Sequence, residues 1–294
     1  MLKYLDTHVL EILDPVSQDF GVKILVKLEN LNHPLISGNK WWKLKYNLEQ
    51  AKRDEQKTLL TFGGAFSNHI FATAAAASEM GFESIGIIRG EEILPLNRVL
   101  KFAKTQGMKL EFISREAYRK KNENAFIEYL REKYGRFFLI PEGGTNALAV
   151  KGCAEFAREK LSSVEFDYLC LPVGTGGTMA GIICGLEGNK EIIGFQVLKG
   201  AEFLMEEINS LAKDFSGRIF SNWNLEMDYH FGGYAKRTKE LDDFITKIDR
   251  QHNIKLDPIY TGKMVAGVFD LINRNRFSKG TTILLVHTGG LNTI

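Results

Sequence analysis

Cysteine is scarce in this chain, and the few cysteines present form no recognisable pattern. Three occur among 294 residues, Cys153, Cys170 and Cys184, and no two of them make a CxxC pair. This spacing excludes a small disulfide-stapled scaffold, so we expect buried, reduced thiols. The six histidines show no HExxH or other ligand-like spacing. We therefore predict no metal site.

Long apolar runs and a strong net charge are lacking as well. With 38 Lys and Arg against 36 Asp and Glu, the net charge is only +2, so nothing calls for nucleic acid or an anionic membrane as partner. No apolar run approaches the roughly 20 residues that a membrane-spanning helix needs. Residues 1–6 lack the apolar core of a signal peptide. These features predict a cytoplasmic enzyme.

The chain has no internal repeat or low-complexity linker; instead, strand-like and helix-like segments alternate along most of it. This rhythm is typical of parallel sheets with right-handed crossovers, and the length suits two modest domains. We predict an α/β fold of two domains, each an open, mostly parallel sheet flanked by helices, with a glycine-rich boundary candidate near 143–144. The expected strands are 23–28, 58–62, 84–88, 109–113, 168–173 and 192–197, and the expected helices are 69–80, 96–106, 115–134, 147–160 and one from 178.

A glycine run follows one of the buried strand candidates. Gly174-Thr175-Gly176-Gly177 separates the strand 168–173 from the helix that opens at Thr178. Glycines allow consecutive backbone N–H groups to converge on an anion, and the start of a helix adds partial positive charge. The run is neither GxGxxG nor a GK[ST] loop, which argues against dinucleotide and P-loop sites. It indicates a phosphate site, with a purely steric turn as the alternative.

One lysine lies in a permissive setting near the N-terminus. Lys40 follows Ser37-Gly38-Asn39, a combination that can deliver an ε-amine to a ligand at the boundary of an element. A nucleophilic lysine must be partly unprotonated, which burial or a neighbouring cation such as Lys43 can achieve. Taken alone, each of these lysines could equally be a solvated surface amine.

The context of these residues gives the chain a family resemblance. The segments are Gly38-Asn39-Lys40-Trp41-Trp42-Lys43-Leu44, Gly63-Gly64-Ala65-Phe66-Ser67-Asn68-His69 and Asp257-Pro258-Ile259-Tyr260-Thr261-Gly262-Lys263. With them the chain resembles the fold-type II pyridoxal-phosphate enzymes of the 1-aminocyclopropane-1-carboxylate deaminase and D-cysteine desulfhydrase group, over nearly its whole length and in the right order. The resemblance implies a tryptophan synthase β-like fold, bound pyridoxal 5'-phosphate, a small amino-acid substrate and a homodimer. We expect a large cofactor-binding domain of residues 1–41 and 146–294, and a small domain of residues 42–145.

The resemblance also implies the roles of individual residues. Lys40 matches the Schiff-base lysine, Lys43 the nearby cation, and Asn68 the asparagine that bonds the ring hydroxyl of the cofactor. Ser67, Tyr234 and Tyr260 fall where the family places a serine and two tyrosines facing the substrate, and a tyrosine could relay a proton if its pKa is lowered. The phosphate cup is matched by Gly174, Thr175, Gly176, Gly177 and Thr178.

Two threonines bear on which branch of the family the chain resembles. In the deaminases a glutamate usually follows the tyrosine of the Asp-Pro-x-Tyr motif, and a leucine lies at the position of Thr288; here the first position is Thr261. The resemblance implies that Thr261 and Thr288 bind the cofactor, where a carboxylate near the pyridine nitrogen would deepen its electron sink and a hydroxyl would not. This pattern favours β-elimination, with D-cysteine giving pyruvate, ammonia and hydrogen sulfide. Either Lys40 or a residue on the other face would take the α-proton.

Other functions remain open at this point. A deaminase of the cyclopropane amino acid is the first alternative, and a lyase or dehydratase acting on another D- or β-substituted amino acid is the second. A non-catalytic cofactor carrier is a third, which the substrate-side residues Ser67, Tyr234 and Tyr260 disfavour. Trp41-Trp42 and Phe71-Ala72 depart from the pairs that the family often has, and we expect them to change the pocket wall.

Overall fold

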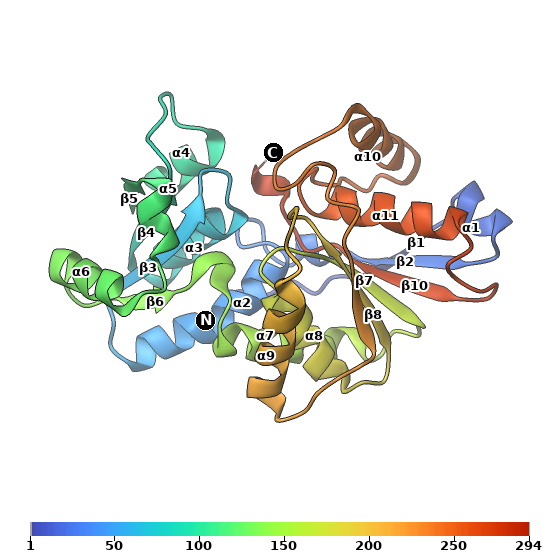
Figure 1. The fold of residues 1–294 in the computed structure, drawn as a ribbon, viewed down its shortest axis with the longest axis horizontal. Coiled ribbons are helices and arrows are strands. Elements are labelled where there is room, and N and C mark those ends of the chain that lie inside the picture. Colours follow the sequence, from blue (N-terminus) through green and yellow to red (C-terminus); the bar gives the residue numbers. More distant parts are fainter. Residues whose placement is uncertain (1, 294) are drawn as a thin grey trace.

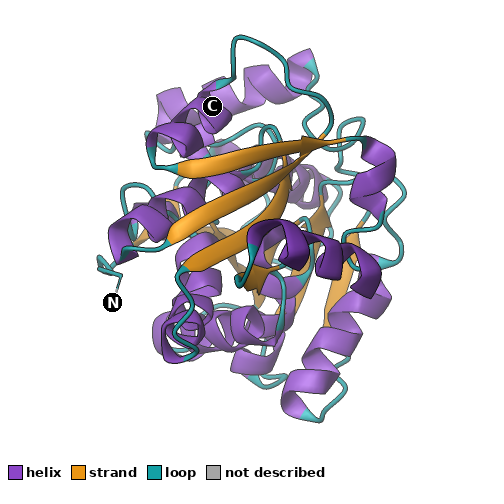
Figure 2. Ribbon diagram, turned by 90° about the vertical axis from the view of Figure 1, so that its left-hand side faces the viewer, coloured by secondary structure: helices purple, strands orange, loops and turns teal. Residues whose placement is uncertain are grey.

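The protein, described by a computed structural model over residues 2–293, consists of two sheets with helices packed against them (Figures 1 and 2). Strand residues are rich in Val, Ile, Leu and Phe with both faces covered, as buried parallel strands require. The larger sheet has six strands, in spatial order β1 (Val9–Ile12), β2 (Lys23–Lys27), β10 (Thr282–Val286), β7 (Tyr168–Val173), β8 (Glu191–Gln196) and β9 (Trp223–Glu226).

The smaller sheet has four strands, all parallel. Its spatial order is β5 (Met108–Ile113), β4 (Glu83–Arg89), β3 (Thr58–Gly64) and β6 (Phe138–Ile140). In the larger sheet only β1 and β2 run antiparallel. The predicted α/β class with two open, mostly parallel sheets is therefore confirmed. The predicted boundaries at 41/42 and 145/146 stay a prediction; the first falls in the opening turn of α2 (Asn39–Arg53).

Helices flank both sheets and lie between them. Beside the smaller sheet are α3 (Asn68–Met80), α4 (Arg98–Thr105), α5 (Arg115–Arg119) and α6 (Asn124–Tyr134), whereas α2 runs between the two halves (Figure 1). The remaining helices, with the short helical turns, are α1 (Pro15–Asp19), η1 (Glu29–Leu31), η2 (Glu142–Gly144), α7 (Ala147–Phe156), η3 (Ala157–Leu161), α8 (Gly177–Leu186), α9 (Leu204–Ser216), α10 (Lys239–His252), α11 (Thr261–Asn273) and η4 (Leu291–Thr293).

The glycine stop predicted for the alanine-rich helix is present. α3 ends at Gly81, which has φ 76° and so takes the left-handed conformation that glycine adopts most easily. Ser67 caps the other end, because its hydroxyl accepts a hydrogen bond from the backbone N–H of Ile70 at 3.3 Å. This cap fixes the direction in which Asn68 and its neighbours leave β3.

The single helix predicted over 115–134 is wrong. The structure has two helices, α5 and α6, separated by a turn in which the N–H of Glu123 donates to the carbonyl of Lys120 at 2.8 Å. Tyr118 and Ile127 both pack into the core beneath the smaller sheet. Nine residues correspond to 2.5 turns of α-helix, so one continuous helix would place these side chains on opposite faces. The turn lets both face the same core.

Two observations concern membranes and cysteines. Over residues 2–293, none of the helices is both long enough and apolar enough to cross a bilayer. The three cysteines are buried free thiols, as expected. Cys170 lies in β7 and Cys184 in α8, so both belong to the packed core of the larger sheet.

Candidate active site

A cleft of about 550 Å³ opens where the carboxyl ends of parallel strands from both sheets meet. Its walls are built from residues that follow β3, β6, β7, β8 and β10, the edge at which open α/β sheets usually bind ligands. Most residues predicted from the sequence are brought together here. Those that line the cleft are Lys40, Lys43, Ser67, Asn68, Gly174, Thr175, Gly176, Thr178, Tyr234, Tyr260 and Thr288.

Lys40 lies in the first turn of α2, partly exposed to the cleft. Its Nζ donates to Oδ1 of Asn39 at 2.8 Å, and Nδ2 of Asn39 donates to the hydroxyl of Thr178 at 2.8 Å. Burial lowers the pKa of Lys40 from 10.5 to about 8. An amine held by an amide rather than by a carboxylate, with a pKa of about 8, loses its proton far more easily than a solvated lysine does. It therefore meets the requirement for forming a covalent bond with a carbonyl group.

Lys43 lies one turn further along α2 and is almost completely buried. Its Nζ donates to Oγ1 of Thr145 at 2.8 Å, and that hydroxyl lies 2.6 Å from Oγ1 of Thr175 in the glycine loop. Burial, followed by the charge of Lys40, lowers the pKa of Lys43 to about 7. Thr145 was missed by the sequence analysis, although it directly follows the Glu142-Gly143-Gly144 segment noted as a boundary.

The glycine loop and α8 form a cradle in which a side chain would not fit. Gly176 has φ 73° and is the N-cap of α8 without a side-chain cap of its own. A Cβ at Gly174 would lie 3.2 Å from the ring of Tyr260, and one at Gly177 would lie 2.8 Å from Cγ2 of Thr145. Gly176 and Thr178, at the start of α8, line the cleft, and no side chain caps this helix end, which suits a phosphate. Gly177 itself does not line the cleft.

The two predicted tyrosines meet at the cleft wall. The rings of Tyr234 and Tyr260 have centroids 6.1 Å apart and cross at 71°. Burial raises the pKa of both phenols, and that of Tyr260 well above 10. The idea that a lowered pKa lets a tyrosine relay protons as a base is therefore not supported. At neutral pH each phenol stays protonated and can donate a hydrogen bond.

The two threonines that bear on the branch of the family lie in different surroundings. Thr288 is 7% exposed and lines the cleft. Thr261 is fully buried; its hydroxyl donates to Oδ2 of Asp257 at 2.6 Å and accepts from the N–H of Asp257 at 3.0 Å. Asp257 also accepts from the N–H groups of Ile259 and Tyr260 at 2.9 and 2.8 Å. Thr261 thus shapes the turn that carries Tyr260 rather than facing the cleft.

The surroundings of Trp41, Trp42 and His69 also bear on the site; of these three, only His69 lines the cleft. Trp41 and Trp42 are 4% and 2% exposed and do not line the cleft, so the prediction that they change the pocket wall is wrong.

His69, adjacent to Asn68, packs against Thr61, and its Nε2 lies 2.7 Å from Oγ1 of Thr61. That hydroxyl donates its proton to the carbonyl of Ile140 at 2.8 Å, so His69 must donate from Nε2. Burial holds the pKa of His69 well below 6.5, which leaves the ring neutral.

The buried lysines make a prediction about stability and pH in the enzyme stripped of cofactor. An unfolded Lys43 titrates near 10.5 and the folded one at about 7, so between these values the unfolded chain binds more protons. The free energy of unfolding therefore rises with pH. We expect a rise of about 1 kcal/mol per pH unit from Lys43 between pH 7 and 9, measured by urea denaturation.

A matched variant separates this contribution from others. Lys43→Met removes the charge and keeps the length of the side chain, so the slope of stability against pH should decrease. The window ends at pH 9 because the raised pKa of Cys153, about 11, acts in the opposite direction above its ordinary value of 9.0. An unchanged slope in Lys43→Met would contradict a depressed pKa at this position.

Fold and site together define a class of enzyme, one in which a deprotonatable lysine and an anion-binding loop at a helix N-terminus face a single cleft between two α/β sheets. Comparison with known proteins agrees: the sequence profile of the family described as "Pyridoxal-phosphate dependent enzyme" matches residues 5–289. The chain belongs to this family, and its cofactor is pyridoxal 5'-phosphate.

The relatives also agree with the resemblance seen in the sequence. A Pyrococcus furiosus protein, provisionally named 1-aminocyclopropane-1-carboxylate deaminase, is 32% identical, with 96% of this chain and 89% of the relative covered. The Arabidopsis thaliana "Bifunctional D-cysteine desulfhydrase/1-aminocyclopropane-1-carboxylate deaminase, mitochondrial" is 30% identical, over 92% and 73% of the two chains. A crystal structure of an "ACC deaminase homologue" superposes with a TM-score of 0.86 at 30% identity, covering 100% and 92%.

Within the described residues, 2–293, three or more His, Cys, Asp or Glu side chains nowhere gather as a metal ion would require. The prediction that the enzyme works without a metal stays a prediction. The residues present do fit the cofactor of the family: an amine of lowered pKa, a glycine cradle, and a helix N-terminus lie on one cleft.

Proposed function

We propose that this enzyme catalyses β-elimination on a small amino acid, and that D-cysteine is its substrate. D-cysteine and water would give pyruvate, ammonia and hydrogen sulfide. The observation that carries the proposal is that threonine stands at both positions 261 and 288: Thr288 lines the cleft, and the hydroxyl of Thr261 is bonded to Asp257. Neither supplies the carboxylate that would deepen the electron sink for opening a cyclopropane ring.

The positions of several cleft residues support roles in holding the cofactor. Lys40 would bond it covalently, the Gly174–Thr178 loop with the start of α8 would take its phosphate, and Asn68 would bond its ring hydroxyl. Thr288 would lie at the ring nitrogen, with Lys43 adding positive charge. When bound, the cofactor supplies an electron sink that stabilises the negative charge left by the α-proton.

The protein's own side chains would handle the substrate. Ser67, with the N–H groups at the start of α3, would bind the substrate carboxylate, and its position at the N-terminus of that helix supports this role. The hydroxyl oxygen of Ser67 accepts from Ile70, which leaves its hydrogen available for donation. Lys40, once displaced by the substrate amine, is a base of suitable pKa for the α-proton. The protonated phenols of Tyr234 and Tyr260 can donate hydrogen bonds, which favours departure of a thiolate.

The alternative is deamination of 1-aminocyclopropane-1-carboxylate, the reaction that the names of the relatives include. The two reactions are distinguished by their products, because only elimination from cysteine releases sulfide and a three-carbon keto acid, whereas ring opening gives a four-carbon keto acid. We expect kcat/KM for D-cysteine to exceed that for the cyclopropane substrate by on the order of 100-fold. L-cysteine and D-serine complete the assay. A preference for the cyclopropane substrate would refute the proposal and leave the cofactor assignment intact.

Two coarser expectations accompany this proposal. The resemblance to the family supports a homodimer, and the low net charge, with no apolar run long enough to cross a bilayer, supports a cytoplasmic location. Sedimentation of the holoenzyme at several concentrations would test the dimer, and fractionation of cells that express the protein would test the location.

A further inference from the structure

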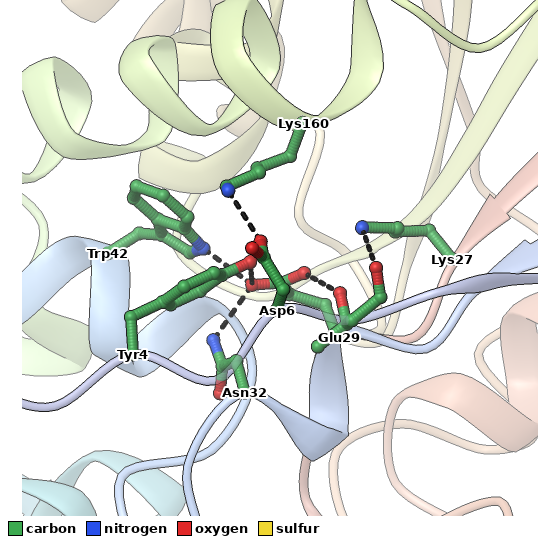
Figure 3. Close-up of polar contacts among 8 residues, drawn as sticks. Tyr4, Asp6, Lys27, Glu29, Asn32, Trp42 and Lys160 are labelled. Carbon is green, nitrogen blue, oxygen red and sulfur yellow. Dashed lines mark hydrogen bonds and ion pairs between the residues drawn. The ribbon is translucent and has the colours of Figure 1, made fainter.

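A carboxylate lies buried directly behind the segment that carries Lys40. Glu29, in the short helix η1 that follows β2, is 1% exposed. Its Oε1 accepts from the indole N–H of Trp42 at 2.7 Å, from Nδ2 of Asn32 at 2.8 Å and from the hydroxyl of Tyr4 at 3.1 Å. Its Oε2 accepts from the hydroxyl of Thr7 at 2.8 Å. Figure 3 shows Trp42, Asn32 and Tyr4 gathered around this carboxylate.

The charge of Glu29 is compensated by these donors rather than by a direct ion pair. The nearby Lys27 ammonium donates to the carbonyl of Thr7 at 2.6 Å, and Lys160 is bonded to Asp6 at 2.6 Å. Burial raises the pKa of Glu29, while the bonds from Trp42, Thr7 and Asn32 act in the opposite direction. An indole N–H and an amide NH₂ can only donate, so both need the acceptor oxygens of Glu29.

Two of the four donors hold the chain on either side of Lys40. Asn32 binds Gly38 twice: its Nδ2 donates to the carbonyl of Gly38 at 3.0 Å, and its Oδ1 accepts from the N–H of Gly38 at 2.8 Å. Gly38 is the N-cap of α2 and has no side chain to cap the helix. Trp42, two residues beyond Lys40, is bonded to Glu29 directly. One carboxylate thus fixes the backbone both before and after Lys40.

We propose that Glu29 is a positioning residue that holds segment 38–42 in place and thereby aims the amine of Lys40 into the cleft. Glu29 is not among the cleft-lining residues, so it acts only through Asn32 and Trp42. The inference rests on the proposed role of Lys40, but it is independent of the substrate. Whether D-cysteine or another amino acid reacts, the order of segment 38–42 is measured separately.

The test compares variants of the holoenzyme by amide hydrogen exchange, by cofactor affinity and by kcat. Glu29→Leu removes every acceptor, so exchange over residues 38–44 should accelerate on the order of tenfold or more, with unchanged exchange in β7 and β10. Pyridoxal phosphate should dissociate more readily, and kcat should fall more than KM changes. Glu29→Gln keeps one acceptor oxygen for Trp42 and Asn32, and it should restore most of each property.

Controls come from the same cluster. Tyr4→Phe removes the hydroxyl that donates to Glu29 and keeps the ring that packs against Trp41 and Trp42, so it should leave exchange over residues 38–42 and kcat close to the native values. Glu29→Leu leaves buried donors without acceptors and can fail to fold. Trp42→Phe is a milder variant, because it removes only the hydrogen bond from Trp42 to Glu29 and keeps an aromatic ring at this position. We expect faster exchange over residues 40–44 in that variant too. Unchanged exchange in Trp42→Phe, or a uniform acceleration over the whole chain in Glu29→Leu, would overturn the proposal.

Discussion

Replacing Lys40 with alanine is expected to lower kcat by about 10⁴-fold or more, a loss typical of removing a residue that forms a covalent bond in the reaction. The reason lies in the position of Lys40: its amine reaches the cleft from the first turn of α2, and burial lowers its pKa to about 8. Borohydride should fix the cofactor to Lys40 in the native enzyme, bleaching its colour. In Lys40→Ala, neither the bleaching nor a labelled peptide is expected.

Lys45→Met is the matched control for this variant. Lys45 lies on the same helix and is largely buried, but its ammonium forms an ion pair with Glu155 and does not line the cleft. This variant should keep both the borohydride label on Lys40 and most of the activity. A label that appears on Lys43 in the native enzyme would transfer the covalent role to that residue, because Lys43 also has a lowered pKa.

Local patterns were sufficient to predict the parts of the site that are contiguous in sequence. The strand 168–173, the glycine loop and the helix after it form one uninterrupted unit, and the structure has them as β7, Gly174–Gly176 and α8. The alternation of strands and helices likewise predicted the α/β class, because buried parallel strands read as apolar runs. Elements after residue 197, among them α9, α10, α11 and β10, were not assigned from the sequence.

What the sequence did not disclose depends on contacts between distant residues. Glu29 belongs to a residue type that is usually exposed, and only the fold brings Tyr4, Asn32 and Trp42 around it. Thr261 was expected to face the cofactor, but the turn after Asp257 directs its hydroxyl to that carboxylate instead. Such preferences are decided by burial and by competing hydrogen-bond partners, and neither can be read from spacing.

The structure also changes how the tryptophan pair next to Lys40 should be understood. Trp41 donates its indole N–H to the carbonyl of Lys3 at 3.0 Å, and Trp42 donates to Glu29. Their rings pack edge to face with each other, with centroids 4.8 Å apart. The pair thus connects the N-terminal segment to the start of α2. Because neither tryptophan lines the cleft, substrate specificity depends on the residues that do.

Gly38→Ala is expected to have the second large effect, because it disturbs two walls of the site at once. Gly38 has φ 69°, and a Cβ there would lie 2.0 Å from the carbonyl oxygen of Thr288 and 2.3 Å from its carbonyl carbon. The same oxygen accepts from the N–H of Asn39 at 3.1 Å. The strain of alanine at φ 69° and ψ −142°, a backbone conformation essentially restricted to glycine, and the overpacking together should cost about 2–5 kcal/mol of unfolding free energy. Because the backbone of Thr288 cannot give way alone, Lys40 and Thr288 should both shift, and activity should be lost with them.

Gly81→Ala is the control for an alanine at a positive φ without a steric clash. Gly81 has φ 76° at the end of α3, and a Cβ there would meet nothing within 4 Å, so this variant carries the left-handed strain only, about 1–2 kcal/mol. We expect Gly81→Ala to keep its kcat and its affinity for the cofactor, and Gly38→Ala to lose both even at temperatures where it is still folded by circular dichroism. Equal stability and equal kcat in the two variants would mean that the backbone contact between Gly38 and Thr288 does not hold the site together.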